Sequence, residues 1–130
     1  MDSNRLRAIP VFAALDDEQL RRIATFATER SVAQGDVLVR EGDYAEDLMV
    51  IEEGRATVSR DGAEIAALGA GDFFGEIAVL DKTRRNATVT AASPMRLVIL
   101  SHWDLKRIPG AMEDIRATSR ARKGEDVGAR

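Results

Sequence analysis

The sequence predicts a mainly β domain, a sandwich or barrel, with helices at both ends. Short apolar runs recur at nearly even spacing through the middle of the chain, and glycine, aspartate and proline separate them. That rhythm is typical of antiparallel folds built from short strands. The two ends carry apolar residues at helical spacing instead. With 130 residues, the chain is long enough for one domain with a single core.

The N-terminal segment, up to about Arg30, is predicted to be helical. Asp16 is the predicted N-cap, and Gln19 three residues later completes a capping-box pattern. Apolar residues then follow at helical spacing, namely Leu20, Ile23, Ala24 and Ala27. A short helical or irregular segment that packs on the rest is predicted ahead of Asp16, from Leu6, Ile9, Val11, Phe12 and Leu15.

The middle segment, from Ser31 to Leu100, is predicted to form the strands. Six apolar runs mark them, at residues 37–39, 48–51, 56–59, 65–68, 87–90 and 97–100. Asp61-Gly62 lies between two of these runs and predicts a hairpin. A two-residue type I′ turn needs positive φ at both central positions, and this pair tolerates that conformation.

The C-terminal segment begins with a second predicted helix start. Ser101 and Asp104 have capping-box spacing, and Trp103 is expected to anchor this helix to the core. Pro109-Gly110 breaks or kinks the helix. A further helix is predicted over 111–122, so the predicted domain covers 1–122 and a polar, disordered tail covers 123–130.

The composition excludes several classes of function. The net charge of −3, from 19 basic and 22 acidic residues, argues against nucleic acid as the main partner. Without cysteine no disulfide framework is possible, which favours an intracellular, cytoplasmic protein. No apolar run approaches the roughly 20 residues that span a bilayer, and the polar first residues lead us to expect no secretion signal.

The scarcity of histidine and cysteine also argues against catalysis. His102 is the only histidine, whereas a metal site or a histidine-based triad needs further partners. We therefore expect no enzyme, no metal and no cofactor.

One segment, Gly71 to Val89, breaks the strand rhythm. Ile77 and Ala78 suit a short helical turn, and Gly75 before it lets the backbone approach a ligand closely. A helix start offers unpaired N–H groups and a partial positive charge, which suit an anion. Arg85 follows, and its guanidinium can pair with two phosphate oxygens in a fork.

Glu76 needs a separate reason, because a carboxylate beside a phosphate is repulsive. Accepting a hydrogen bond from a sugar hydroxyl would supply one, and a 3′,5′-cyclic nucleotide keeps its 2′-OH free. The alternative is a plain surface ion pair between Glu76 and Arg85, worth under ~1 kcal/mol. The residue chemistry alone leaves both interpretations open.

Two stretches of the chain resemble a known family. The first is 38–54, and the second joins Phe74-Gly75-Glu76, Ala78-Val79, Arg85 and Ala87-Thr88-Val89. Together they resemble the cyclic nucleotide-binding domain of bacterial catabolite activator proteins, of cAMP-dependent protein kinase regulatory subunits and of cyclic nucleotide-gated channels. The resemblance extends over about residues 10–120. It implies an eight-stranded β-roll, jelly-roll-like, with an N-terminal helix and C-terminal lid helices.

The resemblance also implies roles for matching positions. Gly75 and Glu76 would face the ribose, the amides of Ile77 and Ala78 would meet the phosphate, and Arg85 would pair with its exocyclic oxygens. The amide of Asn86 would add a donor, and Val58 and Ile65 would line the base. Phe74 and Ala87 complete the implied ligand-binding set, and the last helix, Met112 to Arg120, would cover the base.

The implied ligand is cAMP, with one departure from the family pattern. The family usually has Ala, Ser or Thr after the arginine, where this chain has Asn86. Its carboxamide oxygen can accept a hydrogen bond from a guanine amino group, so cGMP is the alternative. The other interpretation is that Asn86 is a tolerated small polar residue with no role in selecting the base.

The expected function is a two-state sensor with a hinge at Pro109-Gly110. We expect no DNA-binding element in the chain, so the output would pass through a regulated partner protein, a homo-oligomer or a domain outside this sequence. There are two rival hypotheses. One is a cyclic nucleotide hydrolase, which would need metal ligands. The other is a protein-interaction domain that has the β-roll fold but does not bind a nucleotide.

Overall fold

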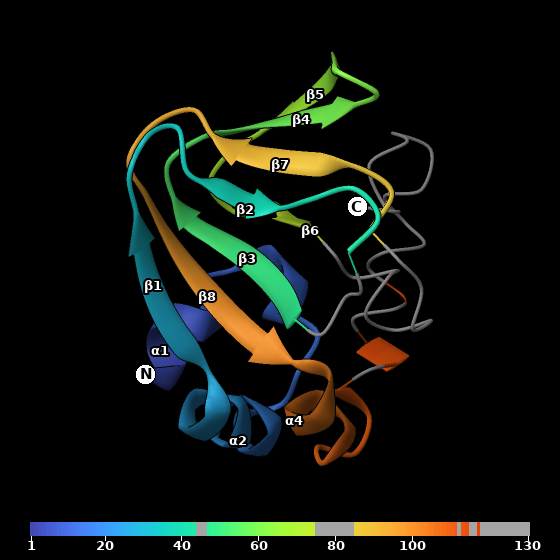
Figure 1. Cartoon of the computed structure of the whole chain (residues 1–130). Helices are drawn as coiled ribbons and strands as arrows, with labels where there is room; N and C mark the ends of the chain where they lie inside the picture. The colour runs from blue at the N-terminus through green and yellow to red at the C-terminus, as the bar shows by residue number, and fades with distance from the viewer. Residues whose placement is uncertain (44–46, 75–84, 112, 115–116, 118–130) are drawn as a thin grey trace.

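Two four-stranded antiparallel sheets make up the β part of the molecule (Figure 1). The computed structural model describes residues 1–43, 47–74, 85–111, 113, 114 and 117. The strand orders are β1-β8-β3-β6 and β2-β7-β4-β5. The strands are β1 (Thr28–Val32), β2 (Val37–Val39), β3 (Asp47–Glu53), β4 (Ala56–Arg60), β5 (Ala63–Leu68), β6 (Phe73–Phe74), β7 (Thr88–Ala91) and β8 (Met95–Ser101). The predicted eight-stranded roll with flanking helices is confirmed.

The molecule has two layers of core, divided by the sheet that contains β3 and β8. One cluster fills the space between the two sheets, and the other fills the space between the β3–β8 sheet and the helices. The two residues of β6 show the division, because successive strand residues point to opposite faces. Phe73 packs in the helix-side cluster and Phe74 in the cluster between the sheets.

The N-terminal helices lie beside the β1–β8–β3 sheet, and α2 lies at the end of the molecule opposite the β4–β5 hairpin (Figure 1). They are α1 (Ser3–Arg7), the 3-10 helix η1 (Pro10–Phe12) and α2 (Asp17–Phe26). The predicted capping box at the start of α2 is confirmed: the Asp16 side chain accepts from the amide of Gln19, and the Gln19 side chain accepts from the amide of Asp16.

The prediction that this segment stays helical to about Arg30 is wrong. α2 ends at Phe26, and Thr28–Val32 forms β1, an edge strand paired with β8. Four of its five residues are exposed, with only Val32 buried. A polar edge strand lacks the apolar alternation by which strands are predicted, so its sequence resembles the end of a solvated helix.

The predicted hairpin is confirmed. β4 and β5 pair across Asp61-Gly62, whose φ angles are 53° and 82°, both positive as a type I′ turn requires.

The C-terminal helix α4 (His102–Lys106) starts where predicted, since the Ser101 side chain accepts from the amide of Asp104. The prediction that Trp103 anchors it is wrong, because Trp103 is 64% exposed. Leu105 of α4 and Ile108, just after the helix, are buried instead. Most of the predicted helix over 111–122, the lid within it and the tail over 123–130 lie outside the described residues, so the domain boundary stays a prediction.

Gly54 closes the turn between β3 and β4 in a conformation that only glycine adopts easily. Its φ is +104°, and a Cβ there would lie 2.6 Å from the carbonyl oxygen of Pro94. Gly54→Ala is therefore expected to lower the free energy of unfolding by about 2–3 kcal/mol in urea denaturation. Gly35→Ala is the matched control, with φ +94° and open space around it. An equal loss in both variants would show that the contact with Pro94 costs nothing.

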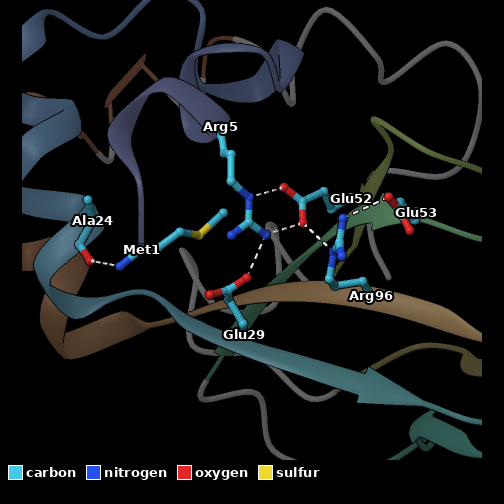
Figure 2. A network of polar contacts seen from close by, with 7 residues as sticks. All are labelled: Met1, Arg5, Ala24, Glu29, Glu52, Glu53 and Arg96. Carbon is cyan, nitrogen blue, oxygen red and sulfur yellow. Dashed lines mark hydrogen bonds and ion pairs between the residues drawn. The ribbon is translucent and has the colours of Figure 1, made fainter.

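An ion-pair network fastens α1 to the sheet (Figure 2). Arg5 of α1 donates to Glu52 on β3 through Nε (3.0 Å) and Nη2 (2.5 Å), and Nη2 also reaches Glu29 on β1. Arg96 on β8 donates to Glu52 (2.7 Å) and Glu53 (2.7 Å). Hydrogen bonds from Arg5, and then from Arg96, lower the pKa of Glu52 below its ordinary value of 4.5.

The lowered pKa of Glu52 predicts that acid destabilises the fold. The native state binds a proton at Glu52 less readily than the unfolded chain, so this stabilisation is present above about pH 4.5 and is lost as the pH falls through the native pKa. Urea denaturation between about pH 3 and 7 should show that Glu52→Gln is less stable than wild type at neutral pH, with the difference shrinking in acid. Glu64→Gln, at an exposed position on β5, should not change the pH dependence; a constant difference for Glu52→Gln would contradict the assignment.

Candidate functional site

Arg85 is the only buried polar or charged residue in the described part of the chain, with 5% of its surface exposed. It lies just before β7, close to the predicted strand start. Its guanidinium Nη2 donates to the backbone carbonyl of Asp47 at 2.7 Å. A buried guanidinium is retained only where hydrogen bonds and opposite charge compensate its lost hydration, so its position here is a specific feature.

The backbone of Arg85 is held as firmly as its side chain. Its amide donates to the carbonyl of Asp43 (2.8 Å), and its carbonyl accepts from the amide of Gly42 (2.9 Å). Gly42, whose amide makes this hydrogen bond, has a φ of +84°, a conformation that favours glycine. The two family-like stretches, 38–54 and the one containing Arg85, are thus joined at this point.

A cavity of about 190 Å³ opens beside the Arg85 side chain. Buried apolar residues from β2 and β3 form part of its wall, and Arg40, Asp43 and Asp47 carry its charges. Its lining residues are Leu38, Val39, Arg40, Asp43, Asp47, Met49 and Arg85. The guanidinium of Arg85 is thus held in a fixed orientation at the wall of a cavity that is lined by both apolar and charged residues. Such a guanidinium suits an anionic group such as a phosphate.

Asn86 and Ala87 follow Arg85 into the sheet. The carbonyl of Asn86 accepts from Nε of Arg60 at 3.0 Å, which ties this segment to the end of β4. The side-chain Oδ1 of Asn86 is buried and has no hydrogen-bond partner among the described residues. Ala87 is fully buried between the sheets.

Of the remaining predicted residues, the three that the structure describes do not form one surface. Val58 and Phe74 are fully buried and belong to the cluster between the sheets. Ile65 is 41% exposed, and the strand register places Ala66, rather than Ile65, opposite Val58. Gly75, Glu76, Ile77 and Ala78 lie outside the described residues, so their roles stay predictions, as does the base-lining role of Val58 and Ile65.

Sequence reasoning missed the residues that hold Arg85 in place. Asp47 and Asp43 act through backbone carbonyls, and Gly42 acts through its amide. Because every residue type has these groups, residue identity carries no signal for such contacts. Arg60 contacts Asn86 from another strand, and only the fold brings them together.

The described residues offer neither a metal-binding cluster nor a helix that could span a membrane. No group of three or more His, Asp or Glu side chains lies close enough together there to hold a metal ion. Within the same residues, no helix has the length and apolar character needed to cross a membrane.

Known proteins resemble this chain in sequence and in structure. A family model described as "Cyclic nucleotide-binding domain" matches residues 29–109. The cAMP-dependent protein kinase regulatory subunit of Schizosaccharomyces pombe is 33% identical over 123 residues, which is 93% of this chain and 30% of that protein. This chain thus spans less than a third of that relative's length.

Solved structures agree with the sequence comparison. A structure described as cAMP-bound PfPKA-R superposes with a TM-score of 0.84 and 25% identity, over 97% of this chain and 44% of that one. The catabolite activator protein of Thermus thermophilus superposes with a TM-score of 0.76 and 26% identity, over 90% of this chain and 59% of that one. The family match covers more than half of the 130 residues, from β1 to the turn after α4. The chain belongs to the cyclic nucleotide-binding domain family.

Proposed function

We propose that this domain binds cAMP as a regulatory sensor, with the phosphate held at Arg85. The observation that carries the proposal is the buried guanidinium of Arg85 at the wall of the cavity, fixed by the carbonyl of Asp47. A guanidinium held in this way presents a planar fork to two phosphate oxygens. The similarity to a structure described as cAMP-bound supports the choice of ligand.

The rest of the proposed site comes from the predicted roles. Glu76 accepts from the ribose 2′-OH, and the amides of Ile77, Ala78 and Asn86 donate to the phosphate. The protein acts by binding, not by hydrolysing its ligand, and its output passes to a partner protein or to a second copy. The regulatory subunit among its relatives supports this kind of output.

A thermal unfolding series tests the proposal. A ligand at 100 times its dissociation constant stabilises the native state by about 2.7 kcal/mol, so saturating cAMP should raise Tm by several degrees. Adenosine 5′-monophosphate lacks the cyclic phosphate, and 2′-deoxy-cAMP lacks the hydroxyl proposed to meet Glu76. Both should stabilise less than cAMP. Equal stabilisation by all three compounds would contradict the proposed contacts.

A second candidate is selectivity for cGMP, and Asn86 favours it. Its Oδ1 is buried and has no hydrogen-bond partner among the described residues. A buried acceptor of this kind costs free energy unless a partner arrives, and the guanine 2-amino group is a suitable donor.

Under this second candidate, Asn86→Ala should weaken cGMP binding by roughly tenfold and change cAMP binding less than about twofold. Competition titrations of both nucleotides against a fluorescent analogue would measure the two ratios. A parallel change for both nucleotides would mean that Asn86 does not read the base.

A further inference from the structure

A second, separate cavity lies between α2 and the end of α4. It has a volume of about 350 Å³ and is lined by Arg22, Thr25, Phe26 and Arg107. Arg22, Thr25 and Phe26 share one face of α2, since they are three and four residues apart. Figure 1 shows α2 and α4 side by side at the end of the molecule opposite the β4–β5 hairpin. The cavity is thus remote from the hairpin. It is also distinct from the cavity beside Arg85, because the two cavities share no lining residue.

Two cations define this cavity. Arg22 and Arg107 are exposed, and neither forms an ion pair with any described residue. Glu18 precedes Arg22 by four residues, where a helical ion pair is common, but no such pair forms in the described structure. Two guanidiniums around one cavity in a chain of net charge −3 form a local site for negative charge.

Two aromatic side chains give the surface around this cavity an apolar character in addition to its positive charge. Phe26 lines the cavity and is half-buried against the helix-side core. Trp103 precedes Arg107 by one helical turn and is 64% exposed, with the Lys106 ammonium 5.5 Å from its ring centroid. Exposed Trp with neighbouring Arg is the composition that concentrates binding energy at protein interfaces. We give the name α2–α4 patch to the four lining residues, Arg22, Thr25, Phe26 and Arg107, together with Trp103, which does not line the cavity but lies four residues before Arg107.

The charges beside the patch limit what can bind. A neighbouring cavity shares Arg22 but is also lined by Asp16 and Glu18. A long polyanion such as a nucleic acid, or an anionic membrane surface, would meet these carboxylates and be repelled. A short acidic segment with apolar residues places its carboxylates on Arg22 and Arg107 alone and its apolar side chains on Phe26 and Trp103.

We propose that the α2–α4 patch is a docking site for a short acidic peptide segment of a partner protein that also carries apolar side chains. The proposal does not depend on nucleotide binding, because the two cavities have different linings. It assigns a protein-recognition role to the helices that flank the roll.

Nuclear magnetic resonance titration of the full chain tests this assignment. The probe is acetyl-Asp-Glu-Leu-Asp-Phe-amide, and its neutral counterpart is acetyl-Asn-Gln-Leu-Asn-Phe-amide. The acidic peptide should shift the amide resonances of Thr25, Phe26 and Arg107 in a saturable way, whereas the neutral peptide and inorganic phosphate should not. No shift at millimolar acidic peptide, or equal shifts with phosphate alone, would overturn the proposal.

Charge reversal gives the matched comparison. Arg22→Glu and Arg107→Glu should each weaken the peptide roughly tenfold. Arg21→Glu changes the net charge by the same amount on the same helix, but Arg21 does not line the cavity, so it should have less than about a twofold effect. Unchanged Tm and unchanged cAMP affinity in all three variants would show that the fold and the nucleotide site are intact. Equal losses of peptide affinity in Arg21→Glu and Arg22→Glu would show that the peptide responds only to the net charge of the domain. That result would refute a specific binding site at the α2–α4 patch.

Discussion

Replacing Arg85 with alanine is expected to lower the affinity for cAMP by roughly 30- to 5,000-fold, which corresponds to ~2–5 kcal/mol. The variant would lose the buried guanidinium and leave the phosphate without its charged partner in a site where water does not compensate. It would also lose the hydrogen bond to the carbonyl of Asp47. Isothermal titration calorimetry, at a temperature where the variant is fully folded, measures the change directly.

Two further variants distinguish the positive charge of Arg85, its two-pronged contact with the phosphate, and the effect of any cation near the cavity. Arg85→Lys keeps the positive charge but cannot form a two-pronged contact, so its affinity should lie between those of wild type and Arg85→Ala. Arg40→Ala removes an exposed cation that lines the same cavity, and a change of less than about fivefold is expected. Wild-type affinity in Arg85→Ala would show that the phosphate is bound elsewhere.

Replacing Phe74 with alanine should produce the largest loss of stability, about 3–5 kcal/mol. Phe74 has no exposed surface and packs between the two sheets, so its removal leaves a cavity that neighbours fill only in part. Phe74→Leu keeps most of the volume and should cost less than about 1.5 kcal/mol. Urea denaturation measures both values.

Trp103→Ala is the matched comparison for an aromatic side chain outside the core. Trp103 is 64% exposed, so its loss should change the free energy of unfolding by less than about 0.5 kcal/mol. The resemblance includes Phe74 in the ligand-binding set, and Phe74→Leu tests that role separately. A large loss of cAMP affinity in stable Phe74→Leu would assign Phe74 to the ligand, whereas unchanged affinity would leave it a core residue.

Much of the fold could be predicted because local chemistry specifies it. The capping box at Asp16, the turn at Asp61-Gly62 and the helix start at Ser101 each depend on residues close in sequence. β1 could not be predicted in the same way, since it is a polar edge strand whose partner, β8, lies far along the chain. Trp103 was predicted wrongly because size and hydrophobicity do not tell which face of a short helix is buried.

The candidate site, like the fold, could be predicted only in part from the sequence. Arg85 was found from its residue type and its place in the motif, and its burial fits a specific role. The contacts that fix it come from backbone atoms of Gly42, Asp43 and Asp47, and residue identity does not predict a contact made by the backbone. The Arg5–Glu52 network depends on three strands and a helix meeting, so it too emerges only from the fold.

Calorimetric titration of cAMP into the wild-type chain tests whether the domain binds the nucleotide at Arg85. We expect saturable heat at one nucleotide per chain, with cGMP competing for the same site and Arg85→Ala abolishing the signal at the same concentrations. The absence of heat and of thermal stabilisation with both nucleotides at millimolar concentration would contradict it, and would leave a roll that serves protein interaction alone.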